Sequence, residues 1–238
     1  MASLEFPPEE SGVLMYRGPV AVSTIQLPGR SLKLVRPADP DALLDDPDVL
    51  ARNDRDDYMP YWAYLWSAST MLAEAILVRW GEVEPTDSPS PPEVLELGCG
   101  LGLGGLAAMS LGYRVCFSDY DPAALEFVGR SVRENGLSAE RFSTRLLDWR
   151  SLPDLRFDRI IAADVLYERR LVPLVADVLA RMLAPGGEAL IATPHRASAE
   201  DFPAAVAAAG LTCRAEAVST LAETEAAGRG TLFQVERG

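Results

Sequence analysis

Glycine occupies five of the eight positions from 98 to 105, in the stretch VLELGCGLGLGG that follows a predicted buried strand at 93–97. Glycine loses more conformational entropy on folding than other residues, so such a run needs a structural reason or a ligand. Because glycine has no Cβ, the backbone can come close to a ligand that another side chain would exclude. In open parallel sheets, ligands bind outside the carboxyl ends of the strands, where the strand order reverses. The run therefore predicts a ligand-binding loop between a strand and a helix.

An acidic residue, Asp119, ends the next predicted strand, 21 residues after Gly98. A carboxylate at that place can accept hydrogen bonds from both hydroxyls of a ribose. Two kinds of ligand carry such a ribose: dinucleotides such as NAD, and S-adenosylmethionine. The glycine spacing formally satisfies the G-x-G-x-x-G pattern of dinucleotide-binding folds, so an NAD-dependent oxidoreductase is one hypothesis.

Glu96, two residues before Gly98, helps to decide between the two ligands. A carboxylate at the mouth of the strand would repel the pyrophosphate of a dinucleotide. It would favour the sulfonium and ammonium groups of S-adenosylmethionine, which has no phosphate. The sequence therefore favours S-adenosylmethionine, with Glu96 supporting its binding. The other interpretation, a glycine turn beside a core strand with Glu96 in solvent, needs no ligand.

The charge and composition of the chain argue against several kinds of binding partner. A formal net charge of −13 and a pI near 4.6 argue against nucleic acid or an anionic membrane surface, which would repel the chain at long range. No stretch reaches the ~20 apolar residues of a membrane span, and the start lacks the order of a secretory signal. Cys99, Cys116 and Cys213 are odd in number and far apart, so we expect reduced thiols and a cytoplasmic protein. The single histidine, His195, leaves little for a zinc site or a Ser-His-Asp triad, and no metal is expected.

Predicted strands and helices alternate from Glu93 to the end of the chain, and they must position these residues. Such alternation implies an α/β fold with a doubly wound, mostly parallel seven-stranded sheet and helices on both faces. The last two strands are joined by a loop, which lets the final strand run antiparallel. The predicted strands are 93–97, 113–118, 142–147, 157–163, 188–193, 211–217 and 231–236, and the predicted helices are 102–111, 122–135, 170–184 and 199–209.

The N-terminal part of the chain has a different pattern. Residues 13–36 hold short apolar runs broken by Gly-Pro and Pro-Gly, which predicts two or three antiparallel strands. Residues 37–58 are rich in proline and aspartate, and we expect a surface loop with one short helix. A helical apolar face follows in MLAEAILVRW, residues 71–80. We therefore divide the chain into a β-hairpin and loop extension at 1–59 and a main domain at 60–238.

Four motifs of the main domain resemble, in order and spacing, those of the class I, or seven-β-strand, S-adenosylmethionine-dependent methyltransferases. They are VLELGCGLGLGG, VCFSDYDPAALEFV, RLLDWR and FDRIIAADVLY. The resemblance implies a Rossmann-like fold with S-adenosylmethionine as the cofactor. In it Asp119 would bind the ribose, Asp148 would receive the adenine amino group, and Trp149 would flank the adenine. The cofactor-binding residues that the resemblance implies are Trp66, Glu96, Gly98, Gly100, Gly102, Asp119, Tyr120, Asp148, Trp149 and Ala163.

Two further motifs resemble one group within this superfamily. PYWAYLW, residues 60–66, and DVLY, residues 164–167, are similar to segments of the protein lysine methyltransferases, including the electron-transfer-flavoprotein β-subunit lysine methyltransferase and its bacterial relatives. The Pro-Pro of amide and adenine methyltransferases is missing. Ser131 departs from the group, where an asparagine is expected, although Asn135 stands at the place of a second one. The resemblance implies an enzyme that methylates a lysine side chain of a protein substrate, and we expect it to be a monomer.

The resemblance points to Asp164 and Tyr167 as the catalytic residues. A lysine is protonated at neutral pH, with a pKa of about 10.4, and must lose a proton before it can attack a methyl group. Asp164 would orient the amine or pass its proton to water, and Tyr167 would line the path of the lysine stem. Each has a simpler interpretation, since Asp164 could cap the following helix and Tyr167 could be half-buried at its start.

Aromatic residues before the first-motif helix could roof the cofactor pocket or hold a cation. Trp66 is expected to face the cofactor, whereas the others are expected to pack in the core. Those others are Tyr61, Trp62 and Tyr64.

Three basic residues that follow predicted strands could have either a functional or a structural role. His195 could act as a base, although a lone loop histidine is more often structural, and Arg150 and Arg196 are expected to be surface charges. Two other functions fit the same fold: a small-molecule N- or O-methyltransferase, and a non-catalytic S-adenosylmethionine-binding protein.

Overall fold

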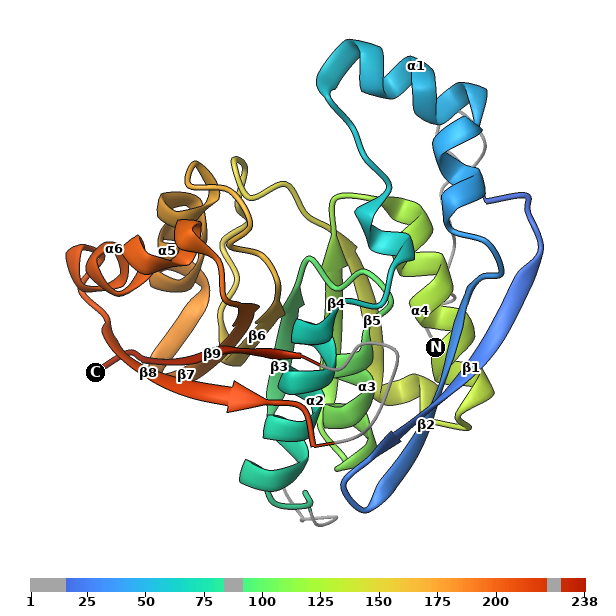
Figure 1. The fold of residues 1–238 in the computed structure, drawn as a ribbon. Coiled ribbons are helices and arrows are strands. Elements are labelled where there is room, and N and C mark those ends of the chain that lie inside the picture. Colours follow the sequence, from blue (N-terminus) through green and yellow to red (C-terminus); the bar gives the residue numbers. More distant parts are fainter. Residues whose placement is uncertain (1–15, 84–91, 222–227) are drawn as a thin grey trace.

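The computed structural model describes residues 16–83, 92–221 and 228–238, and it centres on a seven-stranded sheet (Figure 1). The strand order across the sheet is β5-β4-β3-β6-β7-β9-β8. The chain runs from β3 out to β4 and β5 and then crosses back to β6, so the order reverses beside β3. The strands are β3 (Glu93–Leu97), β4 (Arg114–Asp119), β5 (Phe142–Leu146), β6 (Phe157–Ala163), β7 (Leu183–Pro194), β8 (Thr212–Ser219) and β9 (Arg229–Glu236).

The strands from β5 across to β7 run parallel, and β9 lies antiparallel between β7 and β8. This arrangement confirms the mostly parallel seven-stranded sheet and the antiparallel final strand. β7 begins earlier than the predicted 188–193, because Leu183 already pairs with Phe157 before a shift of register. The segment APGG at 184–187 therefore belongs to the strand, and the preceding helix ends at Met182.

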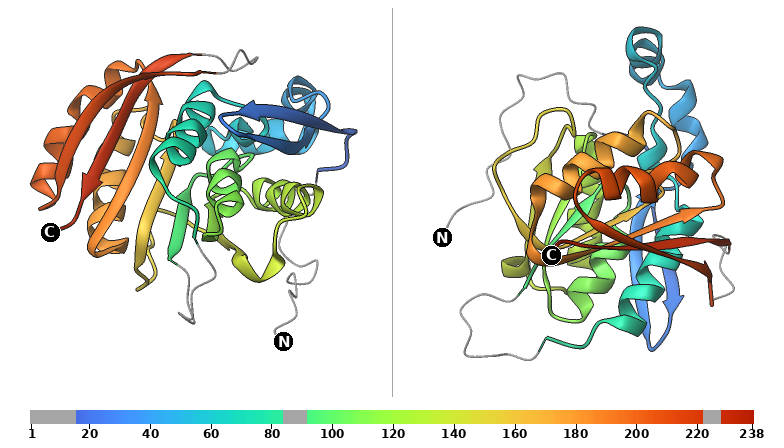
Figure 2. Two further views of the ribbon diagram at one scale, coloured as in Figure 1. Left: turned by 90° about the horizontal axis from the view of Figure 1, so that it is seen from below. Right: turned by 90° about the vertical axis from the view of Figure 1, so that its left-hand side faces the viewer.

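Helices cover both faces of the sheet (Figure 2), as the alternating pattern predicted. One face carries α2 (Ser67–Arg79), α3 (Leu103–Ser110) and α4 (Pro122–Glu134), and the other carries α5 (Leu171–Met182) and α6 (Phe202–Ala208). Side chains of β3 alternate between the two apolar cores. Val94 packs with α2 and α3, whereas Leu95 and Leu97 pack with α5. Burial on both faces explains why the strand sequences are almost continuously apolar.

A proline lies in the first turn of two helices, α4 and α6. Asp121 accepts a hydrogen bond from the backbone N–H of Ala123 at 2.9 Å, and Pro122 occupies the first turn of α4. The predicted helix at 199–209 divides into a 3-10 turn, η4 (Ala197–Asp201), and the shorter α6, which has a proline in its first turn.

The N-terminal strands β1 (Val20–Leu27) and β2 (Arg30–Pro37) form an antiparallel hairpin. They lie within the predicted 13–36, of which 13–15 are outside the described residues. The inner face of the hairpin shares a core with α2 and α3, and Leu34 is fully buried there. The domain boundary after residue 59 stays a prediction.

Side chains of α4 hold the edge of β2. The Asn135 side chain accepts a hydrogen bond from Lys33 N–H at 2.8 Å and donates one to Lys33 C=O at 2.7 Å. Ser131 Oγ accepts a hydrogen bond from Val35 N–H at 2.9 Å. Ser131 in α4 and Asn135, the C-cap of this helix, therefore fix the hairpin to α4.

The segment between the hairpin and α2 contains η1 (Asp41–Asp45), α1 (Pro47–Asp56) and η2 (Tyr61–Ala63). α1 projects beyond the carboxyl ends of β3 and β4 (Figure 1), and Asp46 caps it. The expected surface loop at 37–58 thus holds a 3-10 turn as well as one short helix. Within the described ranges, no helix has the length and apolar character needed to cross a membrane.

Candidate active site

The glycine loop after β3, residues 98–102, follows left-handed backbone conformations. Gly98, Gly100 and Gly102 have φ values of +56°, +51° and +76°, which residues with a Cβ rarely adopt. Gly102 is also the N-cap of α3, and a Cβ there would lie 2.7 Å from Cγ2 of Val128. The loop needs glycine for its backbone path and for the close packing of α3. Contacts of these three glycines with a cofactor stay a prediction.

The next two glycines make room for side chains of the sheet. A Cβ at Gly105 would lie 2.3 Å from Cε1 of Phe117 and 2.6 Å from Oε2 of Glu96. A Cβ at Gly104 would lie 2.8 Å from Oε1 of Glu96. The interpretation of the whole run as space for a ligand was wrong at these two positions, because side chains of β3 and β4 occupy the space.

Glu96 is buried beneath α3, with 2% of its surface exposed, rather than at the mouth of β3. Its Oε2 accepts a hydrogen bond from the backbone N–H of Gly105 at 3.1 Å. Burial raises the pKa of Glu96 to about 8, so the side chain is mostly neutral at pH 7. The expected position of Glu96 at the mouth of the strand was wrong, since alternation along β3 turns the side chain into the helix layer. Its part in cofactor binding stays a prediction.

Asp119 lies at the carboxyl end of β4 and fixes two loops. Its Oδ2 accepts a hydrogen bond from Gly100 N–H at 2.8 Å, and its Oδ1 accepts one from Asp121 N–H at 2.9 Å. Burial raises the pKa of Asp119 to about 6. Each carboxylate oxygen has a second lone pair, so the group can still accept hydrogen bonds from two ribose hydroxyls.

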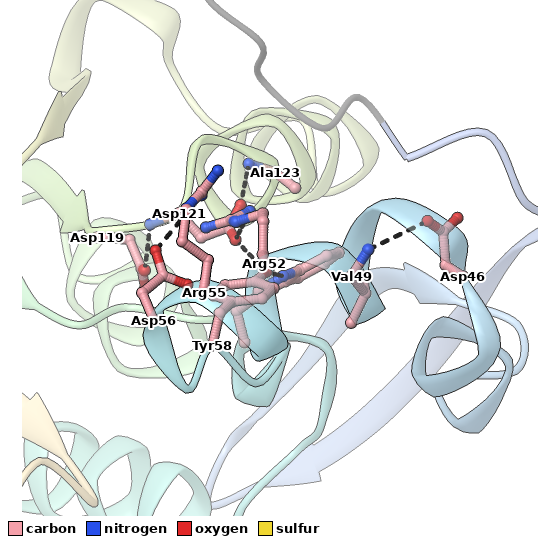
Figure 3. A network of polar contacts seen from close by, with 10 residues as sticks. Asp46, Val49, Arg52, Arg55, Asp56, Tyr58, Asp119, Asp121 and Ala123 are labelled. Atoms are coloured by element: carbon pink, nitrogen blue, oxygen red, sulfur yellow. Dashed lines mark hydrogen bonds and ion pairs between the residues drawn. The ribbon is translucent and has the colours of Figure 1, made fainter.

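A polar network connects Asp119 to the segment before α2 (Figure 3). Asp121 accepts a hydrogen bond from the Tyr58 hydroxyl and forms an ion pair with Arg52 at 3.4 Å. The Arg52 guanidinium lies 3.4 Å above the centre of the Tyr58 ring. This network fixes the residues after α1 to the loop that carries Asp119. Sequence reasoning missed it, because 63 residues separate Tyr58 from Asp121 and no local pattern joins them.

The segment after β5 places Asp148 and Trp149 near the glycine loop. A Cβ at Gly98 would lie 3.4 Å from Cζ2 of Trp149, so the indole borders the loop. The Asp148 carboxylate is held by Arg150, with Nε at 2.9 Å from Oδ1 and Nη2 at 2.7 Å from Oδ2, and this lowers the pKa of Asp148. Arg150 is exposed, as expected, but it is paired with a predicted cofactor residue. Tyr120 is also exposed, and the adenine contacts stay predictions.

Asp164 follows Ala163, the last residue of β6, and is 7% exposed. Its φ of +56° is uncommon for a residue with a Cβ, and its N–H donates to Ala192 C=O at 2.8 Å. It does not cap the following helix, because α5 begins at Leu171 with Arg170 as its N-cap. The simpler interpretation of Asp164 as a helix cap was therefore wrong.

The Asp164 carboxylate forms a bidentate ion pair with Arg196 from the loop after β7. Nε lies 2.7 Å from Oδ1, and Nη2 lies 2.6 Å from Oδ2. Arg196 was expected to be a surface charge, and that expectation was wrong because the guanidinium binds a buried carboxylate. β6 and β7 are parallel neighbours, so their carboxyl ends bring the two residues together across 32 positions of sequence.

Four aromatic residues form a partly exposed group that we call the aromatic rim. The Tyr61 ring lies edge-on to Trp66 and to Tyr167, with centroids 6.1 Å and 5.9 Å apart, and the Tyr64 ring lies 5.9 Å from Trp66. Burial raises the pKa of Tyr167, and the nearby charge of Glu168 adds to the shift. Tyr61 and Tyr64 were expected to be core residues, but they belong to this rim.

Trp62 differs from its neighbours, because it is buried as predicted. Its ring packs against Phe127 with centroids 5.3 Å apart, and its backbone borders Gly100. The chain direction through η2 thus sends Trp62 inward, while Tyr61 and Trp66 turn outward.

His195 lines a cavity of about 230 Å³ at the carboxyl end of β7, together with Arg196, Glu200 and Thr231. A role for His195 as a base stays a prediction. Among the residues that the structure describes, no group of three His, Cys, Asp or Glu side chains could hold a metal ion.

The carboxyl ends of β3, β4, β5 and β6 bring these groups into one site. The glycine loop contacts both Trp149 and Val165, the residue after Asp164, since a Cβ at Gly98 would lie 3.3 Å from Cγ1 of Val165. Asp119 offers acceptors for a ribose, and Trp149 offers a flat apolar surface for a base. These are groups that the nucleoside part of S-adenosylmethionine needs. The segment after β6 that borders the glycine loop also carries the buried carboxylate of Asp164.

A family model described as "Lysine methyltransferase" matches residues 47–204, which is more than half of the chain. The matched range includes α1, the glycine loop, Asp119, Asp164 and Arg196. The match confirms the family that the sequence motifs predicted.

Relatives with curated names match shorter stretches. Protein N-lysine methyltransferase METTL21A of Xenopus tropicalis is 40% identical over 84 residues, covering 34% of this chain and 39% of that protein. Protein-lysine N-methyltransferase rrg1 of Schizosaccharomyces pombe (strain 972) is 30% identical over 145 residues, covering 55% of this chain and 46% of that protein. The chain thus spans about half, or less, of the length of these curated relatives.

A solved structure shares the fold over most of the chain. It is the T. thermophilus 16S rRNA N2 G1207 methyltransferase RsmC, in complex with AdoMet and guanosine. The TM-score is 0.59 at 18% sequence identity, with 92% of this chain and 51% of that chain covered. At this identity the likeness shows the Rossmann-like fold alone.

Proposed function

The chain belongs to the lysine methyltransferase family, and we propose that it transfers a methyl group from S-adenosylmethionine to the side-chain amine of a lysine in a protein substrate. The observation that carries the proposal is the position of Asp164. Its buried carboxylate lies at the carboxyl end of β6, on the loop that contacts Gly98 and leads to the aromatic rim. A carboxylate and aromatic rings are the groups that a lysine side chain needs around it.

The residues that would hold S-adenosylmethionine come from three strand ends. Asp119 accepts the ribose hydroxyls, Trp149 borders the adenine, and the loop from Gly98 to Gly102 lines the remainder. The bound cofactor supplies a methyl group on a positively charged sulfur, and an amine lone pair displaces that sulfur without further activation. The protein therefore has to align the amine and exclude water, which together provide about 7–11 kcal/mol in favourable cases.

Deprotonation of the lysine is the remaining difficulty. At pH 7 an amine with a pKa of about 10.4 is neutral in fewer than one molecule in a thousand, which corresponds to a cost of about 4.6 kcal/mol. We propose that the partly exposed rings of Tyr61, Trp66 and Tyr167 pack along the lysine stem and exclude water around the amine, which disfavours its charged form. Asp164 accepts a hydrogen bond from the amine and orients its lone pair, and the released proton passes to water.

Radiolabelled S-adenosylmethionine tests the proposal directly. The purified protein is incubated with it and with a lysate of the cells from which the sequence comes, and the products are divided into protein and small-molecule fractions. We expect label on one or a few protein bands with the wild type and none with Asp164→Ala, while both bind S-adenosylhomocysteine. Label only in small molecules would indicate a small-molecule methyltransferase. Bound cofactor without label in either fraction would indicate a non-catalytic binding protein.

A further inference from the structure

The ion pair between Asp164 and Arg196 joins a buried acid to a partly exposed base. The Asp164 side chain is 6% exposed and that of Arg196 is 33% exposed. Both oxygens of the carboxylate are engaged by the guanidinium fork, which is the strongest geometry for this pair of groups. Arg196 also lines the cavity at the end of β7. Arg196 therefore lies between the Asp164 carboxylate and this cavity.

The loops that carry the two residues are joined at a second point. The Ser198 hydroxyl donates a hydrogen bond to Leu166 C=O, two residues after Asp164. Arg196 C=O in turn accepts a hydrogen bond from Ala199 N–H at 3.0 Å within η4. The loop after β7 thus holds the DVLY segment through its backbone as well as through the ion pair. This double attachment fixes the segment that carries Asp164 to the loop after β7.

The charge of the pair matters for an amine substrate. A lone buried carboxylate would bind a lysine as its ammonium ion and would stabilise the protonated form, which has no lone pair for attack. Paired with Arg196, the carboxylate forms a unit with no net charge. An ionised carboxylate has about four acceptor positions, and Arg196 uses two of them. The remaining positions can accept a hydrogen bond from a neutral amine.

We propose that Arg196 is a positioning residue for methyl transfer, which orients the Asp164 carboxylate and cancels its charge so that the site accepts lysine as a neutral amine. The proposal rests on the proposed function. It makes Arg196 a determinant of turnover rather than of substrate affinity, since the guanidinium acts on Asp164 and not on the substrate.

Three variants test this role: Arg196→Met, Arg196→Lys and, as a matched control, Arg169→Met. Arg169 lies in the first of the same two loops and pairs with Asp201 of the second at 3.5 Å, but both side chains are largely exposed. The substrate is the protein that the wild type labels in lysate, and kcat and KM are measured separately. The unfolding transition of each variant is measured alongside.

We expect Arg196→Met to lower kcat roughly 10- to 100-fold, with a KM equal to or below that of the wild type. Arg196→Lys keeps the charge without the fork, so its kcat should fall about threefold. Arg169→Met should stay within about twofold of the wild type.

Two results would overturn the role of Arg196 while leaving the proposed function in place. One is a kcat of Arg196→Met equal to that of Arg169→Met; the other is a raised KM at unchanged kcat, which would mean that Arg196 binds substrate directly. If Arg196→Met does not fold, Arg196→Lys decides, and a wild-type kcat for that variant refutes the proposal. A wild type that labels no protein refutes the proposed function and this inference together.

Discussion

The carboxylate of Asp119 accepts a hydrogen bond from the backbone N–H of Gly100 at 2.8 Å, which joins the end of β4 to the glycine loop after β3. The same carboxylate accepts a second backbone hydrogen bond, from Asp121 N–H. One side chain thus orders two loops of the cofactor site while keeping lone pairs for a ligand.

Replacing Asp119 should weaken cofactor binding. Asp119→Ala removes the acceptor of the ribose hydroxyls and of Gly100 N–H, and the loss of hydrogen bonds to a charged group costs about 1.5–3 kcal/mol. We expect the Kd for S-adenosylhomocysteine, measured by calorimetry, to rise roughly 10- to 100-fold. Asp158→Ala is the control, since Asp158 accepts a backbone hydrogen bond from Glu93 at the opposite end of the sheet. Equal Kd values for the two variants would contradict the role of Asp119.

Glu96 should make the protein less stable as the pH rises. Its pKa is about 8 in the folded protein and near 4.5 when unfolded, so the folded state binds more protons between these values. The free energy of unfolding therefore falls as pH increases from about 5 to 8, by on the order of 4 kcal/mol from this group.

Glu96→Gln should remove that part of the pH dependence. Urea unfolding of wild type and variant at pH 5, 6.5 and 8 measures the free energy of unfolding of each protein. The stability of the variant relative to the wild type should increase from pH 5 to pH 8. Parallel pH profiles would show that Glu96 ionises normally despite its burial.

Gly105 should tolerate no side chain, although its backbone conformation is ordinary. The Cβ of Gly105→Ala would lie 2.3 Å from Phe117, so the core must shift, and we expect a loss of about 1–3 kcal/mol in unfolding free energy. Gly81→Ala is the control, because a Cβ there has open space around it. A Gly105→Ala protein as stable as Gly81→Ala in urea would refute the packing described for α3.

The hydroxyl of Tyr58 should stabilise the segment that precedes α2. Tyr58→Phe removes the donor to Asp121, and we expect the free energy of unfolding to fall by about 1 kcal/mol and the Kd for S-adenosylhomocysteine to rise about fivefold. Tyr64→Phe removes a hydroxyl that donates to the exposed Asp41 and should change neither. If the two variants behave alike, the network around Asp121 has no part in ordering the cofactor site.

Much of the fold was predictable, because both faces of the sheet are buried and helices alternate with strands. The strand at 157–163 was predicted with its observed ends, since an apolar run bounded by charged and turn residues leaves little choice. The position of Glu96 could also have been predicted, because alternation along β3 places it on the same face as Val94, toward α2 and α3. Its nearness to the glycine loop in the sequence does not indicate on which face of the sheet it lies.

The contacts between side chains of the site were harder to predict from the sequence. The partners Asp164 and Arg196 lie 32 residues apart, and Tyr58 and Asp121 lie 63 apart, so only the sheet order and the path of α1 bring them together. The strand order offered one usable signal. β6 and β7 are adjacent and parallel, which predicts that charged residues after both strands meet.

The identity of the methylated residue tests the central claim most directly. Protein labelled in lysate with radiolabelled S-adenosylmethionine is hydrolysed to amino acids, and the label is assigned by chromatography against methyl-lysine standards. We predict that the wild type places the label in methyl-lysine, and that Asp164→Asn, with S-adenosylhomocysteine binding retained, loses it by at least about 100-fold. Label in any other amino acid, or equal labelling by the variant, would contradict lysine methylation at a site built around Asp164.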